Sequence, residues 1–448
     1  MLLVSKLWTS RCDFNMTVSE IMQSYCVKVN GGSGVLVNAM TRDYSYVLTA
    51  AHVIPEKQDD IVVHDYQDDP LGVLSVLIPQ EWRESKSERY DFAILKVDYQ
   101  ERVAQKCLTA SDLSDRAPLT LVGFPETERN SSDPIKEYTG HKISVANELV
   151  IMSLDGVPGT TTIRGMSGGG VYHVQGEKPL LIGVEFQMDG TGREQQYGRS
   201  QCHSLTKFEE LTTAYSSAPM IPAYLECFSN MRGRIFSFNV IDPNNVSKLK
   251  LELERAADYL IENGLLPPYK VMEQYHSDLL IDPTKLGELK TYELWVAYLE
   301  FLVICVLIDQ SGNADDDYLK GLERKRRLVY TSNGTNWVSR LEDLLKTARR
   351  LLDKDGTLIV ASPEPAARVL PPTFRLEKVI SDISVVPNQG PFPVIDSSES
   401  AIFTSFKLTH LEGLRNKCVV DIEDEYPNLQ AGKSHSDLLR EKLSEIIN

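Results

Sequence analysis

Three short segments, far apart in the chain, each place a chemically distinctive side chain beside an apolar run. The segments are Leu48–His52, Asp91–Leu95 and Gly165–Gly169, and they supply a histidine, an aspartate and a serine in that order. An imidazole, a carboxylate and a hydroxyl act on one another only within hydrogen-bond reach. The fold of this chain must therefore bring three distant loops to one place.

Each segment alone has an ordinary interpretation. His52 alone is typical of a structural histidine, Asp91 of a surface residue before a buried strand, and the glycines around Ser167 of a turn. The combination predicts a nucleophilic serine, with His52 as its base and Asp91 holding the imidazole. The order His, Asp, Ser belongs to the chymotrypsin double-barrel arrangement, because other folds with this triad use other orders. The amides of Gly165 and Ser167 are expected to bind the oxyanion.

Residues 20 to about 210 have the pattern of an all-β fold. Short apolar runs alternate with turn signals, which is typical of a barrel or sandwich. The expected strands are Cys26–Val29, Gly34–Val37, Tyr46–Leu48, Ile61–Val63, Ala93–Val97, Leu119–Val122, Glu148–Met152, Gly169–Tyr172 and Leu180–Phe186.

Composition narrows the classes of partner. The 448 residues carry a formal charge of −16, which argues against nucleic acid or an anionic membrane as partner. The seven cysteines are odd in number and widely spaced, so neither a disulfide framework nor a zinc site is expected. The apolar run 294–308 is too short to span a bilayer, and the N-terminus does not resemble a signal peptide. We expect a cytoplasmic protein that needs no metal or cofactor.

The second half has helical spacing. Helices are expected over 246–263, 286–308 and 337–352, with a last one capped by Ser436. The domains predicted are 1–215, a linker at 216–223, and a mainly α (α+β) domain at 224–448 with a possible subdivision near 385–400. No second catalytic constellation is visible in that half. The run 315–317 is interpreted as a solvated acidic loop, and the basic run 324–327 as a solvated helix face or protein contact.

Residues 26–205 resemble the trypsin-like peptidases, and among them the HtrA-type branch. The resemblance implies an N-terminal all-β double-barrel chymotrypsin-like fold with the triad in the cleft between the barrels. Val53 and Met166 depart from secreted trypsins, which carry a cysteine and an aspartate there, and the second half does not resemble a PDZ domain. The matching segments are 32–37, 46–54, 91–97, Gly123-Phe124-Pro125, 165–171 and 181–184.

The resemblance also implies where a substrate lies. The strand from Gly183 through Phe186 should pair with the peptide, with Glu185 facing the S1 pocket and Thr161 near its base. A carboxylate there would favour Lys or Arg at P1. The alternative is that Glu185 pairs with a nearby arginine such as Arg164, which leaves the pocket neutral.

Two functions remain open from the sequence. The first is an intracellular serine endopeptidase that cleaves proteins through an acyl-enzyme and is controlled or recruited by its C-terminal half. The second is a catalytically silent trypsin-fold module that binds peptides or partner proteins. The architecture resembles the protease effectors of bacterial multi-component conflict systems, in which the C-terminal half docks a protein partner, often an NTPase. That resemblance implies a partner on residues 224–448 and a role in antiviral defence.

Overall fold

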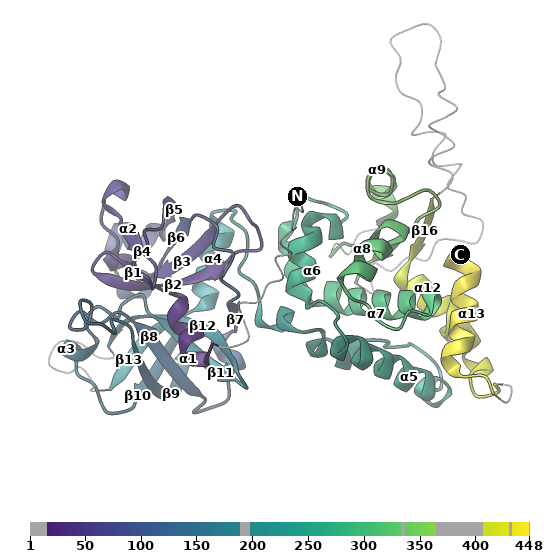
Figure 1. Cartoon of the computed structure of the whole chain (residues 1–448), viewed down its shortest axis with the longest axis horizontal. Helices are drawn as coiled ribbons and strands as arrows, with labels where there is room; N and C mark the ends of the chain where they lie inside the picture. The colour runs from purple at the N-terminus through teal and green to yellow at the C-terminus, as the bar shows by residue number, and fades with distance from the viewer. Residues whose placement is uncertain (1–15, 189–197, 333–336, 364–405, 430–431, 448) are drawn as a thin grey trace, which may run out of the picture. The chain divides into compact units, whose positions relative to one another are not determined.

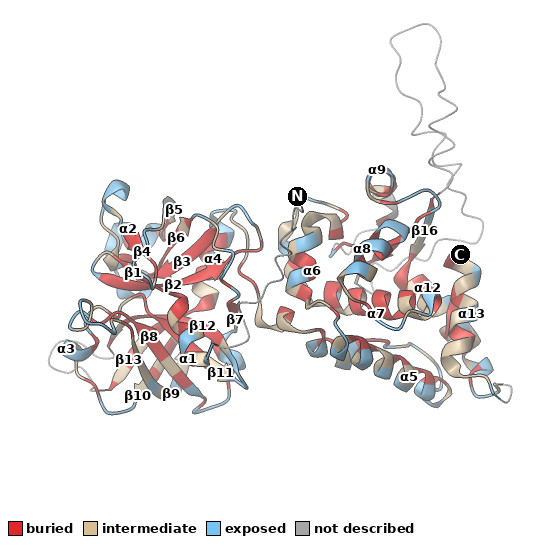
Figure 2. Ribbon diagram, viewed as in Figure 1, coloured by how far each residue is buried: buried red, intermediate tan, exposed pale blue. Residues whose placement is uncertain are grey.

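The computed structural model describes residues 16–188, 198–332, 337–363, 406–429 and 432–447 (Figure 1). The chain divides into two compact units, residues 1–223 and 224–448. Each unit has hydrophobic clusters of its own, and Figure 2 shows their buried residues in red.

The first unit contains two antiparallel β systems, which confirms the predicted all-β double-barrel fold. One is a six-stranded sheet in the order β4-β1-β2-β3-β6-β5. In the other, the order β11-β8-β9-β10-β13-β12 closes on itself through a β11–β12 pairing, and β7 adds to β12 in parallel. The strands are β1 Cys26–Val29, β2 Gly32–Asn38, β3 Ser45–Thr49, β4 Val63–His64, β5 Val73–Leu77, β6 Ala93–Val97, β7 Lys106–Cys107, β8 Pro118–Gly123, β9 Lys136–Ala146, β10 Leu149–Leu154, β11 Gly170–Gln175, β12 Lys178–Met188 and β13 Arg199–Ser204.

Short helices complete this unit: α1 Val18–Ser24, α2 Gln80–Ser85, α3 Thr160–Ile163 and α4 Leu205–Ala214. The expected linker at 216–223 is not a free connection. Met220 is fully buried and forms a bridge with Ala39, while the amide of Cys107 donates to the carbonyl of Ile221 at 3.0 Å. The segment is fixed because its backbone hydrogen-bonds to residues of both β systems, beside the end of β2 and beside β7.

The second unit is mainly helical, as predicted. Its helices are α5 Pro243–Glu262, α6 Pro268–Tyr275, α7 Tyr292–Asp309, α8 Asp316–Lys325, α9 Leu341–Leu351, α12 Leu411–Cys418 and α13 His435–Ile447. Helix α7 packs against α5 and α13, and Trp295, Tyr298 and Phe301 on it are fully buried. No helix in the described ranges is both long enough and apolar enough to cross a membrane.

A three-stranded parallel sheet is the feature of this unit that the sequence did not predict. Its order is β14 (Arg326–Tyr330), β15 (Thr357–Ala361) and β16 (Lys407–His410). The expectation that the basic run 324–327 forms a solvated face is wrong for its last two residues. Arg326 and Arg327 are buried in β14 and pair with Asp309 at 2.8 Å and Glu323 at 2.7 Å. The acidic run 315–317 begins α8, where Asp315 caps the helix. The possible subdivision near 385–400 lies outside the described residues.

Candidate active site

The pairing of β3 with β6 brings His52 and Asp91 together. Thr49, the last residue of β3, is opposite Ala93, the first residue of β6. His52 follows the end of one strand and Asp91 precedes the start of the other, so their side chains meet. The Nδ1 atom of His52 lies 2.7 Å from Asp91 Oδ2, and the His52 backbone N–H donates to Asp91 Oδ1 at 2.8 Å. Because the carboxylate accepts from Nδ1, the lone pair remains on Nε2.

Opposing effects set the proton affinity of His52. Burial alone lowers the pKa of the imidazole, because desolvation disfavours its charged form. The hydrogen bond and charge of Asp91, with a smaller contribution from the charge of Glu185, outweigh burial and leave the pKa above its ordinary value. Asp91 is buried, whereas the His52 side chain is 43% exposed and open to a reactant.

Ser167 lies in the loop between α3 and β11. Its hydroxyl donates to the backbone carbonyl of Phe186 at 3.1 Å. No hydrogen bond between Ser167 and His52 occurs among the described residues. The structure therefore brings His52 and Asp91 into direct contact and places Ser167 on a β12 carbonyl.

Two amides in this loop have no acceptor. The N–H groups of Gly165 and Ser167 donate to no partner within the described part of the chain. Gly165 has φ +88°, and a Cβ there would stand 2.8 Å from the Glu126 nitrogen, so only glycine fits. Paired free amides beside a nucleophile are the donors that an oxyanion requires.

A hydroxyl from the first β system holds the nucleophile loop. Ser33 on β2 is fully buried, its amide donates to the carbonyl of Ser167, and its hydroxyl donates to that of Gly165, both at 2.8 Å. Thr49 in turn donates to the Ser33 carbonyl at 2.7 Å. The sequence analysis missed Ser33, although its place in the matched segment 32–37 was a usable signal.

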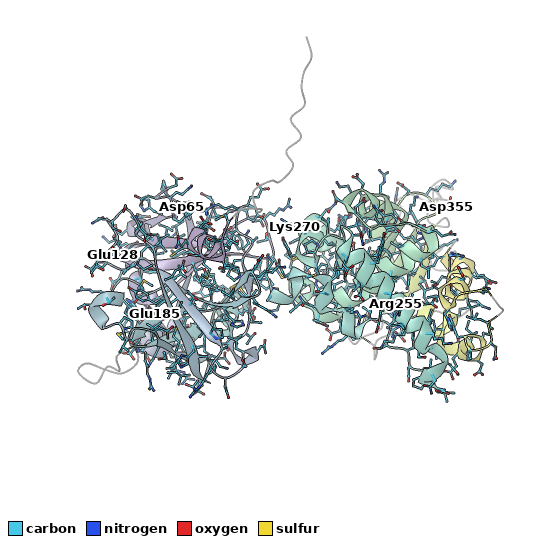
Figure 3. The ribbon with its side chains drawn as sticks, turned by 60° about the horizontal axis from the view of Figure 1, so that its bottom comes forward. Asp65, Glu128, Glu185, Arg255, Lys270 and Asp355 are labelled. Carbon is cyan, nitrogen blue, oxygen red and sulfur yellow. The ribbon has the colours of Figure 1, made fainter. Side chains whose placement is uncertain are left out.

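Glu185 on β12, labelled in Figure 3, is buried to 2% exposure, and its charge acts on His52. Ser200 donates to its Oε1 at 3.0 Å, and Oε2 has no hydrogen-bond partner among the described residues. Burial raises the pKa of Glu185 to about 7. The alternative pairing with Arg164 is wrong, because that side chain is exposed and bonds Glu126 at 2.9 Å.

Two of the expected substrate contacts need correction. Gly183 is paired on both sides, with Val171 of β11 and Ser204 of β13, so its backbone offers no free edge to a peptide. Thr161 lies on α3 with its side chain exposed, so it does not line the base of an S1 pocket as expected. The loop forms a helical turn there and directs this side chain outward. The β11 pairing of β12 ends at Val184, so Glu185 and Phe186 lie beyond it.

The sequence analysis also missed His203, a buried neutral imidazole on β13. Its ring stacks on Phe186 at 4.2 Å and lies 5.1 Å from the ring of Phe92, the residue after Asp91. It hydrogen-bonds the backbone of Glu88, and burial lowers its pKa to about 4. Because Nε2 has no partner in the described chain, Nδ1 carries the proton and makes that bond. His203 thus ties β13 to the turn that presents Asp91.

The comparisons with known proteins agree with this division. A model of the trypsin-like peptidase domain matches residues 32–184, and a model of C-terminal domain 4 of the ABC-three component (ABC-3C) systems matches residues 202–420. The chain combines a trypsin-like peptidase domain with an ABC-3C C-terminal domain. The predicted resemblance to trypsin-like peptidases and to multi-component systems is therefore confirmed.

Solved structures similar to this chain include kallikrein-related peptidase 10, which is 16% identical at a TM-score of 0.33. That match covers 44% of this chain and 97% of the other. An inactive serine-to-alanine mutant of Rv3671c from M. tuberculosis H37Rv is 15% identical at a TM-score of 0.32, and covers 44% and 90%. A search of curated proteins found no match. In the described ranges no three His, Cys, Asp or Glu side chains form a metal-binding group.

Proposed function

We propose that the N-terminal unit is a serine endopeptidase that cleaves protein substrates. The two amides of Gly165 and Ser167, free of acceptors in the described chain and next to a nucleophile candidate, carry this proposal. A peptide-binding module needs no such pair, whereas a tetrahedral oxyanion does.

In the proposed reaction, His52 Nε2 takes the proton of Ser167 as Oγ bonds to the scissile carbonyl carbon. The carbonyl oxygen becomes an oxyanion held by the two amides. The C–N bond then breaks, the proton passes from His52 to the leaving amine, and an acyl-enzyme remains. Water then attacks the ester carbonyl as His52 takes its proton, and His52 passes that proton to Ser167 Oγ as the C–O bond breaks and the acid product leaves. Asp91 keeps the imidazole in the tautomer that both steps require.

The contact between Ser167 and Phe186 must be exchanged before this reaction. We propose that a substrate backbone N–H takes the Phe186 carbonyl, because β12 has no strand partner on that side beyond Val184 in the described chain. The hydroxyl is then released toward His52. Catalytic hydrogen bonds often form only in the substrate complex.

A fluorophosphonate probe tests the proposal, because it phosphonylates only an activated serine. We expect labelling of the wild type, none of Ser167→Ala, and full labelling of Ser132→Ala, whose exposed serine is a matched control. Equal labelling of wild type and Ser167→Ala contradicts the proposal. So does absence of labelling in the wild type even when it is purified with its bound partners.

The silent binding module is the second candidate function. The observation in its favour is the hydroxyl of Ser167 bonded to Phe186 rather than to His52. Under this function, Ser167→Ala binds peptides as well as the wild type and neither protein is labelled.

We further propose that Glu185 favours Lys or Arg at P1. A buried carboxylate with one unpartnered oxygen gains an ion pair when a basic side chain enters. A peptide library should show this preference, and Glu185→Gln should weaken it about tenfold or more. If Glu185→Gln cleaves with an unchanged P1 preference, Glu185 does not contact the P1 side chain. That result would leave the endopeptidase proposal unaffected.

We propose that the C-terminal unit docks the protein partner that recruits or restrains the peptidase. The support is its match to a domain of three-component systems. We also propose that this partner is an NTPase and that the protein acts in antiviral defence. Both proposals rest on the resemblance of the architecture to the protease effectors of bacterial multi-component conflict systems. Purification of the tagged full chain from its native cells, with identification of bound proteins, tests the partner, and recovery of the chain alone contradicts it.

A further inference from the structure

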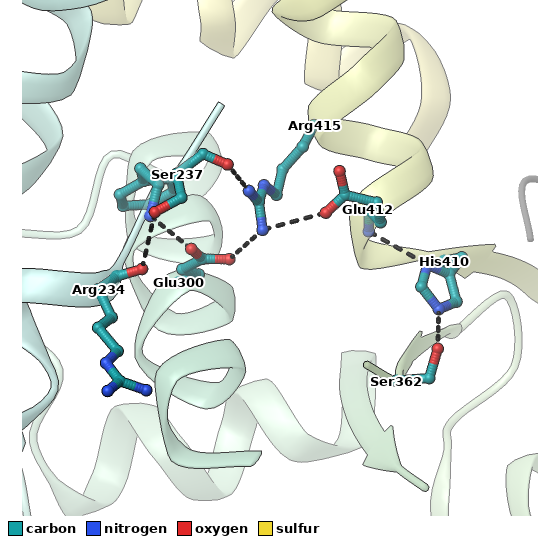
Figure 4. Close-up of polar contacts among 8 residues, drawn as sticks. Arg234, Ser237, Glu300, Ser362, His410, Glu412 and Arg415 are labelled. Carbon is teal, nitrogen blue, oxygen red and sulfur yellow. Dashed lines mark hydrogen bonds and ion pairs between the residues drawn. The ribbon is translucent and has the colours of Figure 1, made fainter. Parts of the chain in front are cut away.

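A cavity of about 390 Å³ lies at the carboxyl ends of β15 and β16, and Figure 4 shows the polar contacts of several residues that line it. Ala361 and Ser362 at the end of β15 line one side, and His410 and Glu412 at the start of α12 line the next. Ligands of parallel sheets bind outside the carboxyl ends of the strands, and small-molecule pockets begin at about 300 Å³. The location and the size both fit a ligand site.

The inner wall of the cavity is an ion cluster of Arg415, Glu412 and Glu300, in which Arg415 Nε has no partner among the described residues. Arg415 contacts Glu412 at 3.1 Å and Glu300 at 3.5 Å, and it also donates to the carbonyl of Ser237. Glu300 accepts the backbone N–H of Phe236 as well. These groups therefore hold each other in place and shape the cavity.

Ser362 and His410 look like a second nucleophile and base, but their hydrogen bonds argue against that role. His410 Nδ1 accepts the backbone N–H of Glu412 at 3.2 Å, so the ring proton is on Nε2. Burial lowers the pKa of His410 to about 4, so the ring is neutral near pH 7. Nε2–H then donates to Ser362 Oγ at 3.0 Å and cannot accept its proton. The hydroxyl proton of Ser362 is left for a ligand.

Two opposite charges on the lining are also unpaired. Arg234 is exposed and stacks over the ring of Tyr292 at 4.9 Å, and Glu293 is exposed at the start of α7. Neither forms an ion pair with any described residue. Among the described lining residues, the groups without a partner are thus the Arg234 cation, the Glu293 carboxylate, the Ser362 hydroxyl donor and the Nε–H of Arg415.

We propose that this cavity binds a small zwitterion of the free amino acid kind. Its carboxylate bonds Arg234, its ammonium bonds Glu293, and an acceptor atom bonds Ser362. A purely anionic ligand would leave Glu293 unmatched, and a purely cationic one would leave Arg234 unmatched.

Calorimetric titration of the full-length Ser167→Ala chain with each of the common free amino acids tests this site. The Ser167→Ala background prevents autolysis and makes the result independent of peptidase activity. We expect at least one amino acid to bind, and its N-acetyl and carboxamide derivatives to bind about tenfold more weakly. No binding by any of them up to about 10 mM overturns the proposal. An N-acetyl or carboxamide form that binds equally well also overturns it.

Variants locate the binding. Arg234→Ala, Glu293→Gln and Ser362→Ala should each weaken it about tenfold. Arg255→Ala should not, since Arg255 is an exposed arginine of α5 outside the lining (Figure 3). An unchanged melting temperature shows that each variant is folded. Binding unchanged in all three folded variants places the ligand elsewhere and rejects this site.

Discussion

At His52, the charges of Asp91 and Glu185 oppose the effect of burial. The imidazole must be neutral to accept the Ser167 proton, so hydrolysis should rise with pH through the His52 pKa. We expect this limb to lie above the ordinary value of about 6.5, because the pKa of His52 is raised. The pH profile of kcat/KM measures it, and an activity maximum near pH 5 would contradict His52 as the base.

Glu185→Gln should move that limb. The carboxylate raises the pKa of His52, so its neutral replacement should lower that pKa and shift the limb to lower pH. Probe-labelling rates against pH measure the shift in wild type and variant alike. A shift to higher pH would show that Glu185 does not act on His52 through its charge.

His203 should act as a positioning residue. His203→Phe keeps the stacked ring but loses the bond to Glu88, so kcat should fall about fivefold to tenfold while KM stays nearly constant. The rise of the probe-labelling rate with pH should also move to lower pH, because a misplaced Asp91 stabilises the charged imidazole less and so lowers the pKa of His52. An equal loss of kcat with no movement of the limb would assign His203 a merely structural role.

The triad candidates could be read from the sequence because each lies in a short motif. The environment of Glu185 could not, because its partner Ser200 comes from the adjacent strand β13. Ser33 and His203 were missed for the same reason, since their partners Gly165 and Glu88 lie far away in the chain.

At the level of elements, the nucleophile loop depends on Gly168. This residue has φ +95°, and a Cβ would stand 1.8 Å from the Ser33 carbonyl oxygen. Gly168→Ala should abolish labelling and destabilise the unit by about 3 kcal/mol or more. Gly31→Ala is the control, because a Cβ there meets nothing within 4 Å. Normal labelling of Gly168→Ala would show that the loop can re-form around a side chain.

Strand β14 depends on the buried pair of Arg327 and Glu323. Arg327→Met removes the cation beside the Glu323 carboxylate and leaves it the hydrogen bond from Tyr298, which costs about 3 kcal/mol when the carboxylate is ionised. The pKa of Glu323 is already raised to about 7, mainly by burial, and loss of Arg327 raises it further. A carboxyl with a raised folded pKa loses stability as pH rises, so the deficit should be larger at pH 8 than at pH 5.5. Denaturant unfolding at both values measures it, and an equal deficit contradicts the pairing.

Helices α5, α7, α9 and α13 could be predicted from their apolar residues, whereas the shorter α6, α8 and α12 were not. The parallel sheet could not be predicted. Strand β14 directly follows α8. Because it begins with two arginines, the sequence there looks like the solvent-exposed end of a helix. Their burial is accompanied by ion pairs of Arg326 with the distant Asp309 and of Arg327 with the nearby Glu323.

At the scale of the whole molecule, two units with separate cores should unfold separately. Calorimetry should resolve two transitions. Gly168→Ala should lower one of them and Arg327→Met the other. A single transition lowered by both variants would show that the units unfold as one.

The order of His52, Asp91 and Ser167 was enough to predict the architecture of residues 26–205, because few folds bring these loops together. The second half offered no such constraint, and its sheet emerged only with the structure. The linker expected at 216–223 was predicted from its prolines and serines. Met220 and Ile221 in the same segment are instead buried in the first unit.

Ser33 belongs to one β system, yet its hydrogen bonds hold the loop that carries Ser167 in the other. The two systems cannot slide apart without releasing the carbonyls of Gly165 and Ser167. Under the proposed function, a binding event that displaced β2 would therefore disturb the Ser167 loop and weaken the reactivity without touching the serine itself.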